Sequence, residues 1–430
     1  MTTLSPLSIP LTDLPADFRA HALQWAAQLA HCAYYEHNDL QAQAPGTFRR
    51  CLAVASAAPG APESLAALPQ YLTQSPTQAP RCGFITYEAK NEVEALSSQN
   101  FSGLSWPTLH FFIPETWLHW QADCVELHGA TAGVLEAILA TPLPLSAPAA
   151  VPPLQPRMPR ADYLQAVESV RTDILHGEVY ELNLCQEFYA ENVELDPVAA
   201  FWRLNEASPA PFAGFLRYHH HYLLCASPER FLSQQQGILT SQPIKGTARR
   251  HPDPAADEQQ RLALLHDEKE RAENLMIVDL VRNDLARVAR TGSVRVPELF
   301  GTYGFKHVWQ LISTVQAELL PGTNLADILR ATFPMGSMTG APKIRAMQLI
   351  EHYERSRRGL YSGSFGYAGP GGDLELNVVI RSLQYRADTG YLSLQVGSAI
   401  TYDSVPALEY QECLLKAQGM LEALETSIAQ

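Results

Sequence analysis

Hydrophobic and polar residues alternate with two distinct periods along the chain. Apolar residues recur every three or four positions, the spacing of amphipathic helices, in four segments: 160–177, 257–288, 341–359 and 406–425. The first of these segments ends at Gly177, a residue typical of helix C-termini. Strands are predicted where residues alternate in steps of two or form short apolar runs: 82–90, 109–115, 178–190, 212–232, 363–369, 374–386 and 391–403. Strands in runs, with helices between them, predict an α+β fold of antiparallel sheets flanked by helices.

A segment rich in Pro and Ala, residues 141–160, interrupts this pattern. Pro cannot continue a helix or a central strand, so we expect the segment to be extended and to act as a linker. It separates an N-terminal portion, 1–140, from residues 161–425, which carry the candidate chemistry. The N-terminal portion contains no motif with chemistry of its own, and we expect it to pack with the second part.

The chain of 430 residues has a formal net charge of −14 and no stripe of Lys or Arg. This charge argues against nucleic acid or an anionic membrane as a partner, although a small anion needs only two or three local cations. The seven cysteines are scattered and never spaced as C-x-x-C, which predicts reduced thiols in a cytoplasmic protein. The start lacks a basic and an apolar region, and no apolar stretch is long enough to span a bilayer, so neither a signal peptide nor a membrane segment is expected.

Two predicted helices carry paired carboxylates. Glu270 and Glu273 are three residues apart on one helix, and Glu409 and Glu412 are three apart on the last helix, so the members of each pair share a helix face. Lys416 lies on the face of the second pair. Two such pairs could hold a hard cation such as Mg²⁺, while two solvated helix faces with an internal Glu–Lys pair are the alternative.

The segment GSMTGAPK, 336–343, contains a predicted helix start. Thr339 or Gly340 is expected to cap this helix, with Pro342 in its first turn. Free N–H groups at a helix N-terminus suit a carboxylate ligand, but capping alone would equally explain Thr339. The spacing does not match that of a phosphate-binding loop.

Other polar residues stand among apolar ones. Arg381 lies in an apolar alternating strand, where an inward side chain needs an anionic partner and an outward one needs none. Tyr367 fits either the core or a ligand site, and Glu229 with Arg230 fits either a catalytic acid or a turn with an ion pair. The run 219–221, HHH, is expected at a hairpin tip, because neighbouring strand residues point to opposite faces and cannot share a metal.

Lys245 stands between Ile244 and Gly246 at the end of an apolar strand. Its side chain is either an ordinary exposed charge or a desolvated amine held for chemistry. The sequence lacks both the G-x-S-x-G motif of serine hydrolases and a G-x-G-x-x-G motif placed after a strand, so neither a hydrolase nor a dinucleotide-binding domain is expected.

Taken together, these segments resemble the family of chorismate-utilising enzymes, which includes anthranilate, aminodeoxychorismate, isochorismate and salicylate synthases. The resemblance runs from about Asp162 to Gly419 and rests on these motifs in order: GEVYELNLCQEF, SPERF, PIKGT, ERAENLMIVDLVRNDL, FPMGSMTGAPKIRAM, GSFGYAG, IRS and ALEYQECLLKAQ. It implies the anthranilate synthase component I-like fold, with antiparallel sheets packed as a β-sandwich-like core flanked by helices. It also implies binding of chorismate, a dicarboxylate, together with Mg²⁺.

The resemblance assigns a role to each matching residue. These roles are Glu273 and Glu412 as metal ligands, Glu270 and Glu409 as holders of metal-bound water, Lys416, Arg381 and Tyr367 at the substrate carboxylates, Thr339, Gly340 and the Gly397 backbone along the site, and Glu229 as the acid that protonates the departing C4 hydroxyl.

Lys245 marks one branch of the family. Members similar to anthranilate synthases carry PIAGT, whereas those that aminate chorismate at C4 carry PIKGT, as this chain does. An amine that attacks C2 can expel the C4 hydroxyl, after which ammonia attacks C4 and expels the amine. We expect burial near Mg²⁺ to lower the pKa of Lys245, which must be neutral to attack, and burial to raise the pKa of Glu229, which must be protonated to act as an acid.

Two departures from family patterns bear on activity. Isochorismate and salicylate synthases carry a lysine where this chain has Glu181, so those activities are not expected. Amine-adding relatives usually carry Gln at this position, and the charge of Glu181 has no role by resemblance. Gln310 stands near the position of a His that is associated with pyruvate elimination in anthranilate synthases. The absence of this His fits an enzyme that aminates chorismate without eliminating pyruvate.

The sequence contains no glutaminase nucleophile motif. The resemblance therefore implies that ammonia comes from solution or from a separate glutamine amidotransferase subunit, and that a separate lyase releases p-aminobenzoate for folate synthesis. Anthranilate synthesis and a non-catalytic, ligand-binding relative are the alternatives. The tryptophan-sensing LLES motif is not visible, so we expect no strong inhibition by tryptophan.

Overall fold

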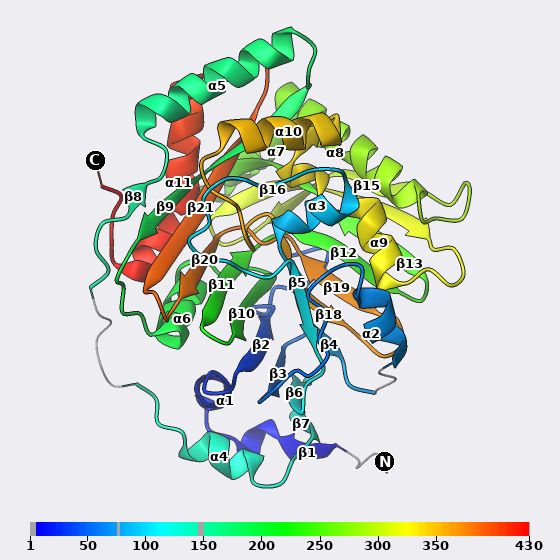
Figure 1. The fold of residues 1–430 in the computed structure, drawn as a ribbon, viewed down its shortest axis with the longest axis vertical. Helices are drawn as coiled ribbons and strands as arrows, with labels where there is room; N and C mark the ends of the chain where they lie inside the picture. Colours follow the sequence, from blue (N-terminus) through cyan, green and yellow to red (C-terminus); the bar gives the residue numbers. More distant parts are fainter. Residues whose placement is uncertain (1–5, 75–77, 145–149, 430) are drawn as a thin grey trace.

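Two antiparallel β-sheets form the centre of the computed structural model, which describes residues 6–74, 78–144 and 150–429 (Figure 1). All neighbouring strands within the two sheets are antiparallel over these residues. The first sheet runs in the order β1 (Leu7–Pro10), β7 (Cys124–Gly129), β6 (Thr116–Trp120), β3 (Cys51–Ala55), β2 (His31–Glu36), β10 (Phe212–Tyr218), β11 (His221–Ser227), β20 (Ser382–Arg386), β21 (Tyr391–Ile400), β9 (Glu181–Ala190) and β17 (Gly340–Ala341), with β8 (Gln155–Pro156) also beside β9. The second runs β14 (Ile244–Arg249), β16 (Val308–Glu318), β13 (Ile238–Gln242), β12 (Arg230–Gln235), β19 (Leu374–Asn377), β18 (Ser364–Ala368), β4 (Arg81–Ile85) and β5 (Leu109–Phe112), with β15 (Arg295–Gly304) also beside β16.

The two sheets pack face to face, which confirms the predicted sandwich. Alternation along β2 is the reason: Tyr34 points to the helices outside, while Tyr35 points to the other sheet. The ring of Tyr35 stacks on Phe365 of β18, with centroids 4.6 Å apart. Buried residues of β2, β3, β10 and β11 thus meet those of β4, β5 and β18 in one inter-sheet core.

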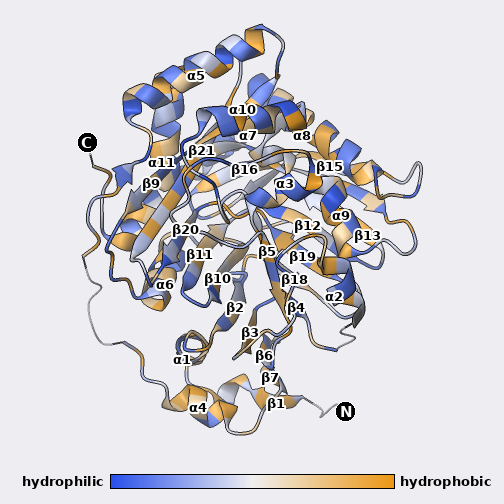
Figure 2. Cartoon of the chain, viewed as in Figure 1, coloured by the Kyte–Doolittle hydropathy of each residue, from blue (hydrophilic) through white to orange (hydrophobic). Residues whose placement is uncertain are grey.

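Helices cover the outer faces of both sheets. Those over the first sheet are α1 (Phe18–Ala26), α4 (Val134–Ala140), α5 (Arg160–Leu175), α6 (Pro197–Ala207), α10 (Lys343–Tyr353) and α11 (Pro406–Leu424). Those over the second are α2 (Leu68–Gln74), α8 (Glu268–Ala286) and α9 (Leu325–Thr332), with α7 (Pro254–His266) against β14 and β16 and the short α3 (Lys90–Val93) following the 3₁₀ turn Tyr87–Ala89. Figure 2 shows hydrophilic residues along the outer helices and mostly hydrophobic ones in the central strands, as this layering requires.

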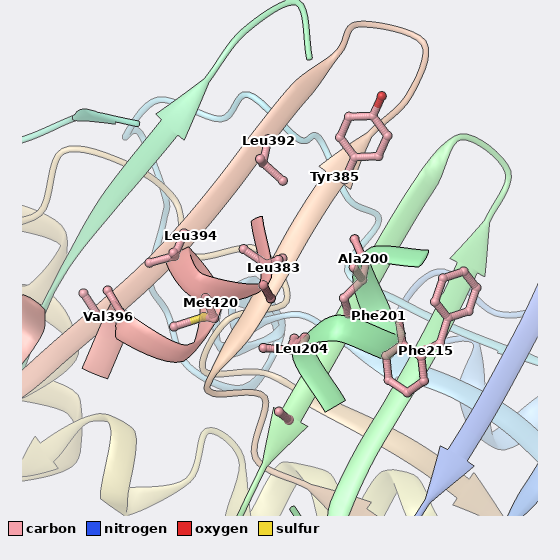
Figure 3. Packing of buried hydrophobic residues seen from close by; sticks show 14 of the residues in the cluster. Ala200, Phe201, Leu204, Phe215, Leu383, Tyr385, Leu392, Leu394, Val396 and Met420 are labelled. Atoms are coloured by element: carbon pink, nitrogen blue, oxygen red, sulfur yellow. The ribbon is translucent and has the colours of Figure 1, made fainter. Parts of the chain in front are cut away.

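The packing under α6 and α11 illustrates this outer core. Phe201 and Leu204 of α6 and Met420 of α11 lie in the same buried cluster as Leu383 of β20 and Leu394 of β21 (Figure 3). Each of these side chains is almost fully buried. For α11 the helix periodicity predicted from the sequence thus matches the face that the helix buries, whereas α6 was not among the predicted helices.

Both sheets contain strands from each part of the chain. In the first sheet β2 pairs with β10, and in the second β4 pairs with β18. Within the predicted linker, residues 145–149 lie outside the described residues, and the short strand β8 pairs with β9. The division into residues 1–140, 141–160 and 161–425 stays a prediction.

One predicted segment differs from the structure in detail. The strand predicted at 374–386 is two strands, β19 and β20, because Arg381 between them adopts a left-handed backbone with φ of 51°. The segment 257–288, predicted as one or two helices, is two helices, since Asp267 ends α7 and its side chain accepts a hydrogen bond from the Glu270 N–H to begin α8. The histidine run lies at a hairpin tip as predicted, with His219 at φ of 53° between β10 and β11.

Candidate functional site

Lys245 and Glu181 form the centre of the candidate site. Lys245 Nζ donates a hydrogen bond of 2.6 Å to Glu181 Oε1, and the two side chains are 9% and 1% exposed. The pairing of β14 with β16 shifts register between Ile244 and Thr247, so Lys245 and Gly246 form an irregularity in the edge strand. Gly246 has φ of 89°, a conformation that favours glycine, and its backbone lies against the Glu270 side chain. The local sequence therefore turns Lys245 out of regular strand geometry beside α8.

The charge of Lys245 is set by its carboxylate neighbours. Burial alone lowers the pKa of Lys245, but Glu181, Glu273 and Glu229 outweigh it and the pKa is raised. The lowered pKa was predicted for a lysine beside bound Mg²⁺, and it stays a prediction for that state. The sequence showed the burial of the lysine but not the carboxylate 2.6 Å from its nitrogen.

Glu229 is a buried carboxyl group on the same side of the site. It lies between β11 and β12 and is 4% exposed. Burial raises the pKa of Glu229 to about 7, against the opposing effects of the Ser337 hydroxyl, Lys245 and Arg381. The predicted direction is confirmed. A small pocket of about 10 Å³ adjoins Glu229 and is lined in part by Ser337 and Asp284.

The two glutamate pairs lie close enough to affect each other. Burial raises the pKa of Glu273 to about 7, with Lys245 opposing the rise and Glu181 and Glu270 adding to it. Burial also raises the pKa of Glu270, to which Glu412 on α11 contributes. Glu409 is buried on the same helix. The structure therefore brings the predicted carboxylates of α8 and α11 to one site.

Two lysines pair with these carboxylates. Lys416 Nζ is 2.6 Å from Glu412 Oε1, and Lys269 Nζ is 3.8 Å from Glu273 Oε1. In the part of the chain that the structure describes, no three His, Cys, Asp or Glu side chains converge as a metal-binding group. The carboxylates are thus gathered in one region without forming a preassembled metal cage.

Cationic groups surround Glu412. Lys416 Nζ also donates a hydrogen bond of 2.8 Å to the Gly397 carbonyl of β21, which fixes the lysine against the sheet. Burial lowers the pKa of Arg381, while Tyr361, Glu412 and Glu229 counteract this effect. Arg381 therefore faces inward among anions, and the outward alternative is excluded.

Tyr367 is not part of this group, which corrects the prediction. Its hydroxyl accepts a hydrogen bond from the Arg49 N–H, and its ring packs on Tyr35 and Phe48 in the inter-sheet core. Tyr361, six residues earlier, is instead the tyrosine that interacts with Arg381. Sequence analysis missed Tyr361 because both tyrosines stand in apolar surroundings and the spacing does not tell which one faces the site.

The loop before α10 lies against the start of β9. Pro342 occupies the N-cap position without a side-chain hydrogen bond, so the predicted cap by Thr339 or Gly340 is wrong. The Thr339 hydroxyl instead donates a hydrogen bond to the Met335 carbonyl, and the loop before α10 is held by main-chain contacts. Gly340 has φ of 148°, and a Cβ atom there would clash with the Glu181 carbonyl oxygen. Both residues keep this loop close to Glu181.

Arg358 ties this loop to the sheet and was missed from the sequence. It is 1% exposed and donates hydrogen bonds to the carbonyls of Met338 (2.7 Å) and Asn183 (2.9 Å) and to the Glu354 carboxylate (2.6 Å). Its guanidinium lies 4.5 Å from the ring centre of Tyr87, in the N-terminal portion. In the sequence it stands in the run RSRRG, where nothing distinguishes it from solvent-exposed neighbours.

Gln310 lies beside the strand of Lys245. It is on β16 opposite Thr247, and it is buried. Its Oε1 atom has no hydrogen-bond partner among the described residues. A buried amide oxygen without a donor is uncommon in proteins, which marks this position as one with capacity for a ligand or water.

Comparisons with known proteins agree with this geometry. A family model described as chorismate binding enzyme matches residues 30–422. The chain is 45% identical over 271 residues to aminodeoxychorismate synthase component 1 of Salmonella typhimurium, covering 63% of this chain and 59% of the relative. It is 35% identical over 363 residues to the protein of the same name from Bacillus subtilis, covering 80% and 77%. The matched segment thus spans about three fifths of the Salmonella relative.

A solved structure extends the likeness to the whole fold. The crystal structure of anthranilate synthase component I from Streptococcus pneumoniae superposes with a TM-score of 0.72 at 26% identity, covering 97% of this chain and 92% of that one. In the described parts of this chain, no helix combines the length and apolar character needed to cross a membrane.

Proposed function

We propose that this chain, which belongs to the family of chorismate-binding enzymes, aminates chorismate at C4. The product is 4-amino-4-deoxychorismate, and the chain acts as component I of an aminodeoxychorismate synthase. The observation that carries the proposal is Lys245, a buried lysine between the predicted acid Glu229 and the glutamates of α8 and α11. The names of the Salmonella and Bacillus relatives support the same activity.

The proposed chemistry divides one difficult substitution into two displacements. The neutral amine of Lys245 forms a bond to C2, the C2=C3 double bond shifts to C3=C4, and the C4 hydroxyl leaves as water with a proton from Glu229. Ammonia then forms a bond to C4, the double bond returns to C2=C3, and the C2–N bond breaks to release the lysine as a neutral amine. The new ammonium group returns a proton to Glu229, so protons and charges balance over the cycle.

The substrate carboxylates are proposed to bind the cationic side of the site. Arg381 and Lys416 face the same region, and the hydroxyl of Tyr361 lies near Arg381. Two cations match the two carboxylates of chorismate. Gly397 holds Lys416 through its carbonyl, and a Cβ at Gly397 would clash with Cys185 and Asn183 of the neighbouring strand.

Mg²⁺ is the proposed cofactor, with Glu273 and Glu412 as ligands and Glu270 and Glu409 around it. The carboxylates fit this role because burial and the neighbouring carboxylates Glu181 and Glu270 raise the pKa of Glu273 to about 7. The shift indicates that negative charge is crowded here, and a divalent cation would neutralise it. When bound, the metal would neutralise and orient the ring carboxylate of the substrate. Gln310 and Thr339 are proposed to line the remaining space.

Ammonia is proposed to come from a separate glutamine amidotransferase subunit, and the product to pass to a separate lyase. The words component 1 in the names of the relatives support the existence of a partner subunit. The proposed setting is p-aminobenzoate and folate synthesis.

A product assay tests the activity. The purified chain is mixed with chorismate, Mg²⁺ and ammonium at mildly alkaline pH, anthranilate fluorescence is followed, and aminodeoxychorismate lyase is then added. We expect p-aminobenzoate only after the lyase is added and no anthranilate. Direct formation of anthranilate would overturn the proposal in favour of anthranilate synthesis. If no product forms either with or without Mg²⁺, the chain would instead be a non-catalytic binding protein.

Lys245→Ala tests the covalent role. We expect this variant to fold, to lose at least 100-fold of its C4 amination and to divert a little of the chorismate to amination at C2. The matched control is Lys90→Ala, which removes a buried lysine that bonds Ser98 and Asn91 away from the site, and should lower stability but not alter the product. Undiminished aminodeoxychorismate formation by Lys245→Ala would refute the adduct.

A further inference from the structure

The carboxylate of Glu181 is the direct neighbour of the proposed nucleophile. It is the first residue of β9, and its main chain is anchored by pairing with Ala341 of β17. Oε1 accepts the hydrogen bond of 2.6 Å from Lys245, and the buried Oε2 has no partner among the described residues. Lys245 is therefore the single donor that the structure offers to this carboxylate within its described residues.

We infer that Glu181 is the base that takes the proton from Lys245 and thereby makes the lysine a nucleophile. The inference rests on the covalent role proposed for Lys245. It gives a chemical task to a carboxylate at a position where amine-adding relatives usually carry Gln.

The proton transfer needs no external acceptor. In the resting site Lys245 is an ammonium, since the surrounding carboxylates raise its pKa. Transfer of one proton from Nζ to Oε1 along the existing hydrogen bond leaves a neutral amine and a carboxylic acid. The lone pair of the amine then forms the bond to C2. After ammonia has displaced the lysine, the carboxylic acid returns its proton to the amine and restores the ion pair.

Burial makes this transfer energetically accessible. Removing water disfavours each charged partner of an ion pair but not the neutral pair, whose hydrogen bond remains. The free Oε2 of Glu181 strengthens this effect, because a buried carboxylate oxygen without a donor is costly to keep charged. Binding of substrate would exclude further water from the site and favour the neutral pair.

The other acidic groups around Lys245 are less suited to this task. Those that face it are Glu181 from β9, Glu229 from the β11–β12 connection, Glu273 from α8 and Glu412 from α11, with the cation Arg381 beside Glu229. Glu229 has to carry a proton already, and Glu273 and Glu412 are the proposed metal ligands. Among the described residues, Glu181 is the carboxylate that hydrogen-bonds the lysine.

Rapid-quench mass spectrometry of Lys245 tests the assignment. The enzyme is mixed with chorismate and Mg²⁺ without ammonia, and the rate of adduct formation is measured between pH 6 and 9 for the wild type, Glu181→Gln and Glu181→Asp. We expect the wild-type rate to be level below pH 7, through proton transfer within the pair, and to fall about tenfold per pH unit above pH 7, where Glu229 loses its proton. In Glu181→Gln the rate should fall at least tenfold at pH 7. It should rise about tenfold per pH unit up to pH 7 and be level above it, because the lysine must lose its proton to solvent while Glu229 must keep its own.

The controls separate a chemical role from a structural one. Glu187→Gln changes a second buried glutamate of β9, which bonds Arg157 and Tyr391, and should leave the pH dependence unchanged. Glu181→Asp keeps a carboxylate and should retain the pH profile of the wild type at a reduced rate, which guards against misfolding of the Gln variant.

Two results would overturn the assignment in different ways. If Glu181→Gln forms the adduct at the wild-type rate and with its pH profile, or faster, then Glu181 is only a counter-ion, and the proposed activity stands. If the wild type forms the aminated product without any adduct, the covalent route itself fails, and the role of Glu181 as base fails with it.

Discussion

Replacing Arg358 by Met should be among the most destabilising single substitutions in the protein. Arg358 is 1% exposed, so the change removes a fully buried cation from the protein interior. Glu354 would keep a buried charge without its partner, 2.6 Å away in the wild type. Breaking a buried ion pair in this way costs about 3–5 kcal/mol.

The lost hydrogen bonds add to this cost. The carbonyls of Met338 and Asn183 would lose donors at 2.7 Å and 2.9 Å, and each buried acceptor left without a donor costs about 1–3 kcal/mol. We therefore expect Arg358→Met to lower the free energy of unfolding by at least about 4 kcal/mol, a large share of the roughly 5–15 kcal/mol of a typical domain. The matched control Arg355→Met, three residues away, removes an exposed arginine and should cost less than about 1 kcal/mol.

Urea unfolding followed by far-ultraviolet circular dichroism measures this loss, as a lower midpoint with an unchanged slope. The double variant Glu354→Leu, Arg358→Met removes both charges and should recover about 2 kcal/mol relative to Arg358→Met. A loss below about 1 kcal/mol for Arg358→Met, or a double variant no more stable than the single one, would refute the reasoning.

Three further predictions concern the site. Gly340→Ala should raise the KM for chorismate and lower kcat, because the new methyl group meets the Glu181 carbonyl. Gly371→Ala, whose methyl group meets no atom within 4 Å, should behave as wild type. Equal kinetics of the two variants would contradict the close packing of the loop. The acid role proposed for Glu229 requires its protonated form, and its pKa is about 7. We therefore expect kcat/KM for chorismate at constant free ammonia to fall about tenfold per pH unit above pH 7; a profile flat to pH 9 would exclude Glu229 as the acid. Tyr361→Phe should weaken chorismate binding about tenfold in a thermal-shift or kinetic assay, while Tyr367→Phe should affect only stability. Weaker chorismate binding by Tyr367→Phe than by Tyr361→Phe would restore Tyr367 as a ligand.

The sequence predicts the elements of this fold better than their arrangement. Helix periodicity and strand alternation identify most segments, because each depends on which face of a short element is buried. The pairing of β2 with β10 and of β4 with β18 joins residues far apart in the chain, and no local pattern encodes that choice. The break at Arg381 was missed for a different reason, since a single left-handed residue leaves the apolar pattern of a strand intact.

For the site, the types of residue were predictable and their environments were not. Helical spacing predicts that Glu270 accompanies Glu273, and the structure brings this pair near Glu412 on the last helix. The direction of the pKa shift of Lys245 depended on a contact with Glu181, which lies 64 residues away in sequence. Burial could be expected for the lysine, but the partner that reverses its effect could not.

The way β4 and β5 complete the second sheet has a consequence for biosynthesis. β4 ends at Ile85, and its neighbour β18 begins at Ser364, roughly 280 residues later, so at about 5–20 residues per second a nascent chain waits about 15–60 s between making the two strands. Throughout that interval the edge of β4 that pairs with β18 in the folded protein is open, and it can pair with another chain. We expect newly made chains to depend on chaperone binding at this segment, and yields to improve when translation of the last 70 residues is not slowed.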